Sequence, residues 1–155
     1  MINVTLRNQI LQLITGKIKT ISGTGFCYLG LSRETPDNDG SNFDEPTECA
    51  SYSRVQLNVN TAMEYTDKFG SVSNGVVTNA EEICTHECLE DDGWGLLTHF
   101  GIFSQETGGT PLAFDYLTDP EGEPDENGVY PAKTLEITKN KVAVFRVGTL
   151  QLKIE

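Results

Sequence analysis

The feature that most constrains the fold is a series of short runs in which apolar and polar residues alternate, with Gly, Pro, Asn or Asp ending a run about every ten residues. Such alternation places successive side chains on opposite faces of a β-strand. Two clear runs contain Val55, Leu57 and Val59, and Leu150 and Leu152. Seven or eight short strands spaced in this way predict a mainly β protein, built as an antiparallel, jelly-roll-like β-sandwich.

Only the N-terminal segment shows a helical period. Thr5 is placed to cap a short amphipathic helix over residues 5–16, and Gly16 is placed to end it. A helix of this length does not hold its shape alone, so it must dock on its own domain or on a neighbour. Its apolar residues fall at i, i+4, i+7 and i+8: Leu6, Ile10, Leu13 and Ile14.

The composition restricts the partners. The chain has 155 residues, with 11 Lys and Arg against 23 Asp and Glu, and a net charge of -12. Nucleic acids and anionic membrane surfaces both need a basic footprint, which is missing. There is no apolar run of membrane-spanning length and no pattern of a signal peptide. We therefore expect a soluble single domain over 1–155, with the β-sandwich covering 24–155.

The cysteines and histidines offer the strongest hint of chemistry. Cys84, His86 and Cys88 form a C-x-H-x-C run that would lie on one face of a strand and could bind zinc, with His99, Cys27 or Cys49 as a fourth ligand. The spacing is not a common zinc pattern, and an edge strand or loop lined by these residues explains it as well. A thiol nucleophile, Cys84 or Cys88 beside a histidine, lacks a recognisable nucleophile turn. Without a signal peptide, we expect free thiols rather than a disulfide framework.

Two acidic loops are candidates for Ca²⁺. The DNDG run at 37–40 resembles the start of an EF-hand loop but departs from the pattern after Asp39, and the second loop, DPEGEPDEN, spans 119–127. Solvated loops explain both as well. The usual phosphate-binding, hydrolase and metalloprotease motifs are missing. The sequence therefore favours binding or assembly over catalysis, with no catalytic residue and no cofactor.

The segment 93–109, GWGLLTHFGIFSQETGG, holds the only tryptophan of the chain, one of its two histidines, two phenylalanines and five glycines. In an extended strand, Trp94, Thr98 and Phe100 would lie on one face and His99 on the other. Both faces also carry apolar side chains. This pattern predicts one central strand over 94–103 that is covered on both sides. The paired glycines that follow supply the positive φ of a hairpin turn.

The order of motifs resembles that of small tail fibre or tail accessory proteins of tailed bacteriophages. The resemblance runs from about residue 5 to the end, and its most specific part is the block from Trp94 to Gly109. Its motifs are Tyr28-Leu-Gly-Leu-Ser32, Glu34-Thr-Pro36, Glu48, Tyr52-Ser-Arg54-Val55, Trp94-Gly95-Leu-Leu-Thr98-His99-Phe100-Gly101-Ile-Phe103, Thr107-Gly108-Gly109 and the alternating strand Leu150 to Ile154.

The resemblance implies a non-enzymatic structural protein of the virion, assembled in the cytoplasm of the host bacterium. It would be either a tail fibre or tail accessory component or a capsid decoration protein. Its partners would be other virion proteins, and it would form a homo-oligomer, for which a trimer is one option. In this interpretation Trp94, Phe100, Ile102 and Phe103 are core, Thr98 and His99 satisfy polar groups between strands, and Arg54 pairs with Glu48.

Two other hypotheses stay open. The chain could be a receptor- or carbohydrate-binding module at a fibre tip, with Trp94 or tyrosines stacking on sugar. A metal-dependent enzyme built on Cys84, His86 and Cys88 is the less favoured option.

Overall fold

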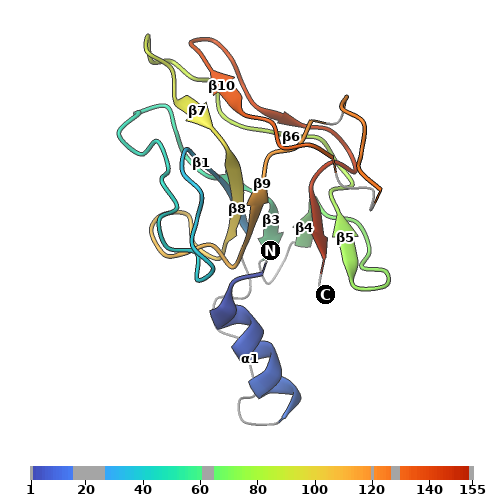
Figure 1. Ribbon diagram of the computed structural model, residues 1–155. Coiled ribbons are helices and arrows are strands. Elements are labelled where there is room, and N and C mark those ends of the chain that lie inside the picture. Colours follow the sequence, from blue (N-terminus) through green and yellow to red (C-terminus); the bar gives the residue numbers. More distant parts are fainter. Residues whose placement is uncertain (1, 16–26, 61–64, 120, 127–129, 154–155) are drawn as a thin grey trace.

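One α-helix precedes twelve short strands, and every strand pair is antiparallel, in the part of the chain that the structure describes (Figure 1). The predicted mainly β, antiparallel architecture with a short N-terminal helix is therefore confirmed. The jelly-roll-like connectivity stays a prediction. Gly16 and Ile154 lie outside the described residues. The computed structural model describes residues 2–15, 27–60, 65–119, 121–126 and 130–153.

A four-stranded sheet forms the centre of the molecule, in the order β2-β1-β8-β9. Its two inner strands, β1 and β8, pair over five residues, and this register sets Gly30 opposite Gly101. One face carries Leu29, Leu31 and Ile102, which are buried in the main core. The strands are β2 (Val55–Gln56), β1 (Tyr28–Ser32), β8 (His99–Phe103) and β9 (Ala113–Tyr116).

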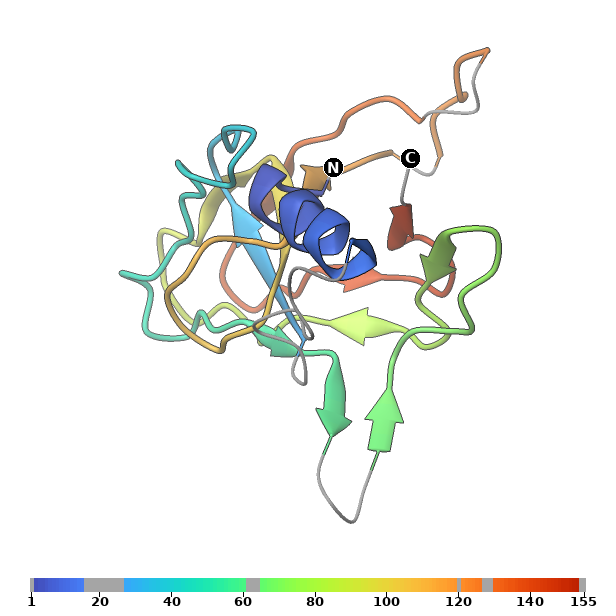
Figure 2. The ribbon, with the colours of Figure 1, turned by 90° about the horizontal axis from the view of Figure 1, so that it is seen from below.

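The other strands form two-stranded pieces around this sheet. Of these, β4 was not predicted, and its ribbon with β3 extends away from the rest of the molecule (Figure 2). The pairs are β7 (Gly95–Leu97) with β10 (Leu135–Ile137), β6 (Ile83–Cys84) with β11 (Val144–Phe145), β5 (Val76–Thr78) with β12 (Gln151–Lys153), and β3 (Asn58–Asn60) with β4 (Tyr65–Asp67).

The single strand predicted over 94–103 is wrong in its first half. Gly95 has a φ of 82°, a left-handed conformation that regular strands do not adopt. The chain then changes partner at Thr98, because β7 pairs with β10 whereas β8 pairs with β1 and β9. Only β8 is the central strand that the pattern predicted, and Leu96 in β7 is exposed.

The main core gathers side chains from nearly every strand pair. Burying aliphatic and aromatic side chains of this size contributes about 1.5–3 kcal/mol each. This cluster therefore holds together strand pairs that share no hydrogen bonds with the central sheet. Its most deeply buried members are Leu29, Leu31, Leu57, Ile83, Cys88, Trp94, Leu97, Ile137 and Leu150.

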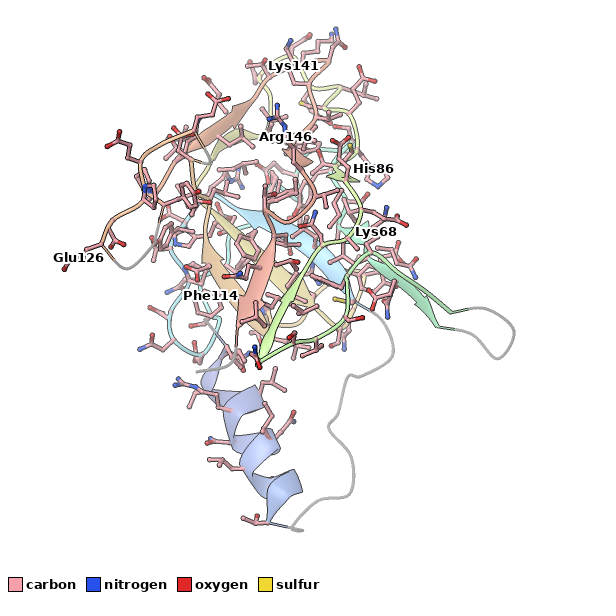
Figure 3. The ribbon with its side chains drawn as sticks, turned by 90° about the vertical axis from the view of Figure 1, so that its right-hand side faces the viewer. Lys68, His86, Phe114, Glu126, Lys141 and Arg146 are labelled. Atoms are coloured by element: carbon pink, nitrogen blue, oxygen red, sulfur yellow. The ribbon has the colours of Figure 1, made fainter. Side chains whose placement is uncertain are left out.

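The helix α1 (Val4–Ile14) begins one residue before the predicted start. The predicted cap at Thr5 is wrong, because the side chain of Asn3 takes that role: its Oδ1 accepts a hydrogen bond from the backbone N–H of Leu6 at 2.8 Å. Its Nδ2 donates to the carbonyl of Pro111, which ties the first turn to the β-structure. Beyond this turn α1 projects away from the β-strands (Figures 1 and 3). No helix of the described residues is long and apolar enough to cross a bilayer.

Candidate functional site

The second face of the central sheet is shaped by the cross-strand glycine pair. A Cβ on Gly30 would lie 2.7 Å from Oε1 of Glu45, and a Cβ on Gly101 would lie 2.6 Å from Cε2 of Phe43. Real Cβ atoms do not approach so closely, so a larger residue at either position would displace the Glu45 carboxylate or the Phe43 ring. The pair leaves a shallow space in which the rings of Phe43 and Phe103 meet edge to face, 5.1 Å apart.

The guanidinium group of Arg54 lies in this space and contacts a carboxylate, two carbonyls and an aromatic ring. Its Nη2 is 2.5 Å from Oε2 of Glu45, and the two side chains are 3 % and 11 % exposed. Its Nη1 donates to the carbonyls of Gln105 and Gly108 at 2.8 Å each. Its guanidinium carbon lies 3.3 Å from the centroid of the Phe103 ring, a cation–π contact. Arg54 thus holds three segments together: the loop before β2, the end of β8 and the hairpin after it.

Tyr52 extends this cluster to β1. Its hydroxyl donates to Oε1 of Glu45 at 2.8 Å and accepts a hydrogen bond from the N–H of Leu31 at 2.9 Å. Burial, and then the Glu45 charge, raise the pKa of Tyr52, so the phenol stays protonated. We call the set Glu45, Tyr52, Arg54 and Phe103 the Arg54 clamp.

The expected ion pair of Arg54 with Glu48 is wrong. Glu48 instead contacts Arg33, whose Nη1 and Nη2 reach both of its oxygens and whose Nε lies 2.9 Å from Oδ2 of Asp44. The hydrogen bonds from Arg33 lower the pKa of Glu48. Because Glu45 and Glu48 lie three residues apart in one loop, the sequence offers no signal that separates their partners.

Trp94 is buried beside the clamp and is 1 % exposed. Its Nε1 donates to Oγ of Ser51 at 3.1 Å and to Oε2 of Glu90 at 3.2 Å, and its ring meets that of Tyr52 edge to face. Hydrogen bonds from the hydroxyl and the backbone N–H of Ser51 are the main reason that the pKa of Glu90 falls to about 2. Trp94 is therefore closed to any ligand, and sugar stacking on this residue is excluded.

The polar residues between β7 and β8 also have internal partners. Thr98 Oγ1 donates to the carbonyls of Ser32 and Arg33 at 3.3 and 3.1 Å, which joins the switch between strands to the end of β1. His99 Nδ1 hydrogen bonds with Thr98 Oγ1 at 2.8 Å. Burial lowers the pKa of His99, which favours its neutral form.

Comparison with known protein families identifies the family of this chain. The family model Gp80, described as podophage GP4 fiber I protein gp80, matches residues 1–153. The chain belongs to the Gp80 family. The resemblance to phage tail fibre proteins is thus confirmed, and the matched range includes the whole Arg54 clamp and Trp94. No curated protein matches this member of the Gp80 family.

The candidate zinc ligands Cys84, His86 and Cys88 of this Gp80-family chain do not continue along one strand. β6 ends at Cys84, so the period of two does not continue, and Cys84 and His86 are exposed whereas Cys88 is fully buried. The prediction that the three share one face is therefore wrong. No cluster of three metal-binding side chains occurs among the described residues. The four free thiols all have raised pKa values, with desolvation as the first cause: Cys27, Cys49, Cys84 and Cys88.

One hollow of this Gp80-family protein, among the described residues, is open and mostly polar. It measures about 490 Å³ and is lined by Glu34, Thr35, Asn42, Phe43 and Asp44. The nearby 37–42 turn uses its carboxylates internally, since Oδ2 of Asp37 accepts hydrogen bonds from the side chains of Ser41 and Asn42. The hollow thus combines the half-buried ring of Phe43 with the carboxylates of Glu34 and Asp44.

Proposed function

We propose that this protein is a non-enzymatic structural component of a bacteriophage virion, and that its place is in the tail fibre apparatus. The observation that carries the proposal is the match of the Gp80 family model to residues 1–153. A match over nearly the whole chain leaves little room for an additional catalytic domain within these residues. The proposal also takes 1–155 as one domain.

The use of the motif residues supports a structural role. Arg54, Glu45, Tyr52 and Trp94 all direct their polar atoms at internal partners. No buried side-chain N or O atom of the described residues lacks a hydrogen bond. Catalytic sites, by contrast, keep titratable groups with perturbed pKa values facing a cleft where a substrate can reach them. These motif residues therefore serve the fold and the placement of loops.

The partners follow from this role. A fibre component associates with other virion proteins after its synthesis in the host cytoplasm, and we propose that it does so as a homo-oligomer. Capsid decoration is the alternative position. A receptor- or carbohydrate-binding module remains a second candidate only through residues other than Trp94, which is buried.

The position in the particle can be tested by immunogold labelling of phage particles that encode this chain. Antibodies against the purified protein should label the tail, and pre-incubation with the antigen should abolish the label. Labelling over the capsid would assign the protein to decoration instead. Particles that carry no label, and no copy of the chain by mass spectrometry, would refute the structural role.

A further inference from the structure

The helix α1 presents a broad apolar half with a single charge inside it. At 100° per residue, the apolar positions of α1 fall on one half of the helix, and Thr5, Asn8, Gln9 and Gln12 fall on the other. Arg7 is the one charged residue of the helix, and it lies within the apolar half, with Val4 at i−3 and Leu11 at i+4. A surface that accepts this half must therefore be partly apolar and must also offer a carboxylate.

Part of this half of the helix is open to solvent, because Val4 and Leu11 are exposed whereas Leu6 and Ile10 are half-buried. The first turn is joined to the rest of the described chain by hydrogen bonds from Asn3 N–H to the carbonyl of Leu112 at 3.0 Å, from Val4 N–H to the carbonyl of Asn38 at 3.4 Å, and from the Asn3 side chain to the carbonyl of Pro111. Leu11 is 60 % exposed and Val4 is 39 % exposed. Arg7 forms no ion pair with another described residue. A helix of 11 residues is marginal in water without packing, so α1 needs a partner surface.

The distribution of charge indicates what that surface is. Residues 1–27, which precede β1, hold three basic residues and no acidic one, whereas residues 28–155 hold the other eight basic residues and all 23 acidic ones. The net charges of the two parts are +3 and -15. The N-terminal part is thus complementary in charge to the remainder of another copy of the same chain.

The hollow lined by Phe43 offers both chemical features that α1 requires. The hollow beside β1 contains the half-buried ring of Phe43 and the carboxylates of Glu34 and Asp44. Glu34 is exposed and has no ion-pair partner in the described part of the chain, whereas Asp44 is held by Arg33. In such a contact, Leu11 would pack on the ring of Phe43 and Arg7 would pair with the carboxylate of Glu34.

We infer that α1 of one copy docks in the Phe43 hollow of a second copy, with Arg7 beside Glu34. The inference rests on the proposed structural role, and it names the contact through which the homo-oligomer forms. The two surfaces of this contact differ, so the interface is heterologous and gives a closed ring when the rotation between copies closes.

Sedimentation velocity and light scattering of the full chain across a dilution series test the inference by charge reversal. Arg7→Glu and Glu34→Arg should each raise the dissociation constant of the oligomer about 30-fold or more, since each places like charges together in a desolvated contact. The double variant should recover most of the affinity. Glu87→Arg changes an exposed glutamate after β6 by the same charge as Glu34→Arg, and it should have no effect beyond the general charge change. Leu11→Asp tests the apolar contact.

The inference is overturned if the wild-type protein stays monomeric at its highest soluble concentration, if either single reversal acts no more strongly than Glu87→Arg, or if the double variant does not recover. Circular dichroism and thermal unfolding verify that each variant folds. The immunogold experiment separates this outcome from the proposed function. Labelled tails with a monomeric chain reject only the docking contact, and unlabelled particles with an oligomer that depends on Arg7 and Glu34 reject only the role in the virion.

Discussion

Replacing Arg54 by methionine should be the most destabilising single change on the second face of the central sheet. Met keeps the length of the stem but leaves the Glu45 carboxylate, 11 % exposed, without its counter-charge. Removing one partner of a buried ion pair costs about 3–5 kcal/mol. The carbonyls of Gln105 and Gly108 also lose their hydrogen-bond donor, and the range of about 3–5 kcal/mol includes this loss. For a chain of this size, the loss corresponds to a fall in melting temperature of about 6–20 °C.

The measurement is urea unfolding at pH 7, followed by the fluorescence of Trp94. Arg33→Met is the matched control, because Arg33 also forms a two-carboxylate contact but lies nearer the surface, 27 % exposed, with partners at 47 % and 59 %. Exposed pairs of this kind contribute about 0–1 kcal/mol. Adding Glu45→Leu to Arg54→Met should recover most of the loss, since removing both buried charges is often nearly neutral.

A loss at Arg54 that does not exceed the loss at Arg33 would refute the reasoning, because burial would then have no influence on the strength of the pair. A double variant less stable than Arg54→Met alone would also contradict it, since the unpaired carboxylate is the stated source of the cost.

Three further results are expected. Gly101→Ala should cost about 1–3 kcal/mol in thermal unfolding, because its Cβ would lie 2.6 Å from a ring carbon. The pKa of Glu90, about 2, lies below its ordinary 4.5, so this group stabilises the fold fully above pH 4.5 and loses that effect as the pH falls toward 2; Ser51→Ala should flatten this part of a melting-temperature profile. A thiol reagent should modify exposed Cys84 in the native protein within minutes, while buried Cys88 reacts only after unfolding, as mass spectrometry would show.

The alternation of residues was a reliable guide where one strand keeps one set of neighbours. The run that contains Leu150 and Leu152 was expected as a strand, and it forms β12, which pairs with β5. The segment 94–103 defeated the same reasoning. Its apolar content is continuous, but Gly95 has a positive φ and the chain changes its partner strand at Thr98. Pairing partners are a tertiary property, and no local pattern encodes them.

The Arg54 clamp shows a different limit of prediction from sequence. The resemblance drew attention to Tyr52 and Arg54, but it assigned Glu48 as the partner of the arginine instead of Glu45. What selects Glu45 is the space left by Gly30 opposite Gly101, and that space exists only once β1 and β8 are in register. The register depends on residues that lie about seventy positions apart in the sequence. A sequence can therefore identify the participants of such a contact before it can identify the pairs.

The geometry of the clamp explains why a buried ion pair occurs on this sheet face. Apolar residues of the same volume would often give equal or greater stability, so net stability alone is a weak reason for its presence. Arg54, however, directs two hydrogen bonds at the hairpin carbonyls of Gln105 and Gly108.

The same hairpin leads directly to the carbonyls of Pro111 and Leu112, which hold the first turn of α1. Directional hydrogen bonds fix a loop in a way that apolar contacts do not, and here a single path of contacts runs from the sheet through the hairpin to the helix. The clamp thus sets the direction in which α1 leaves the molecule, which is what a chain that assembles through that helix requires.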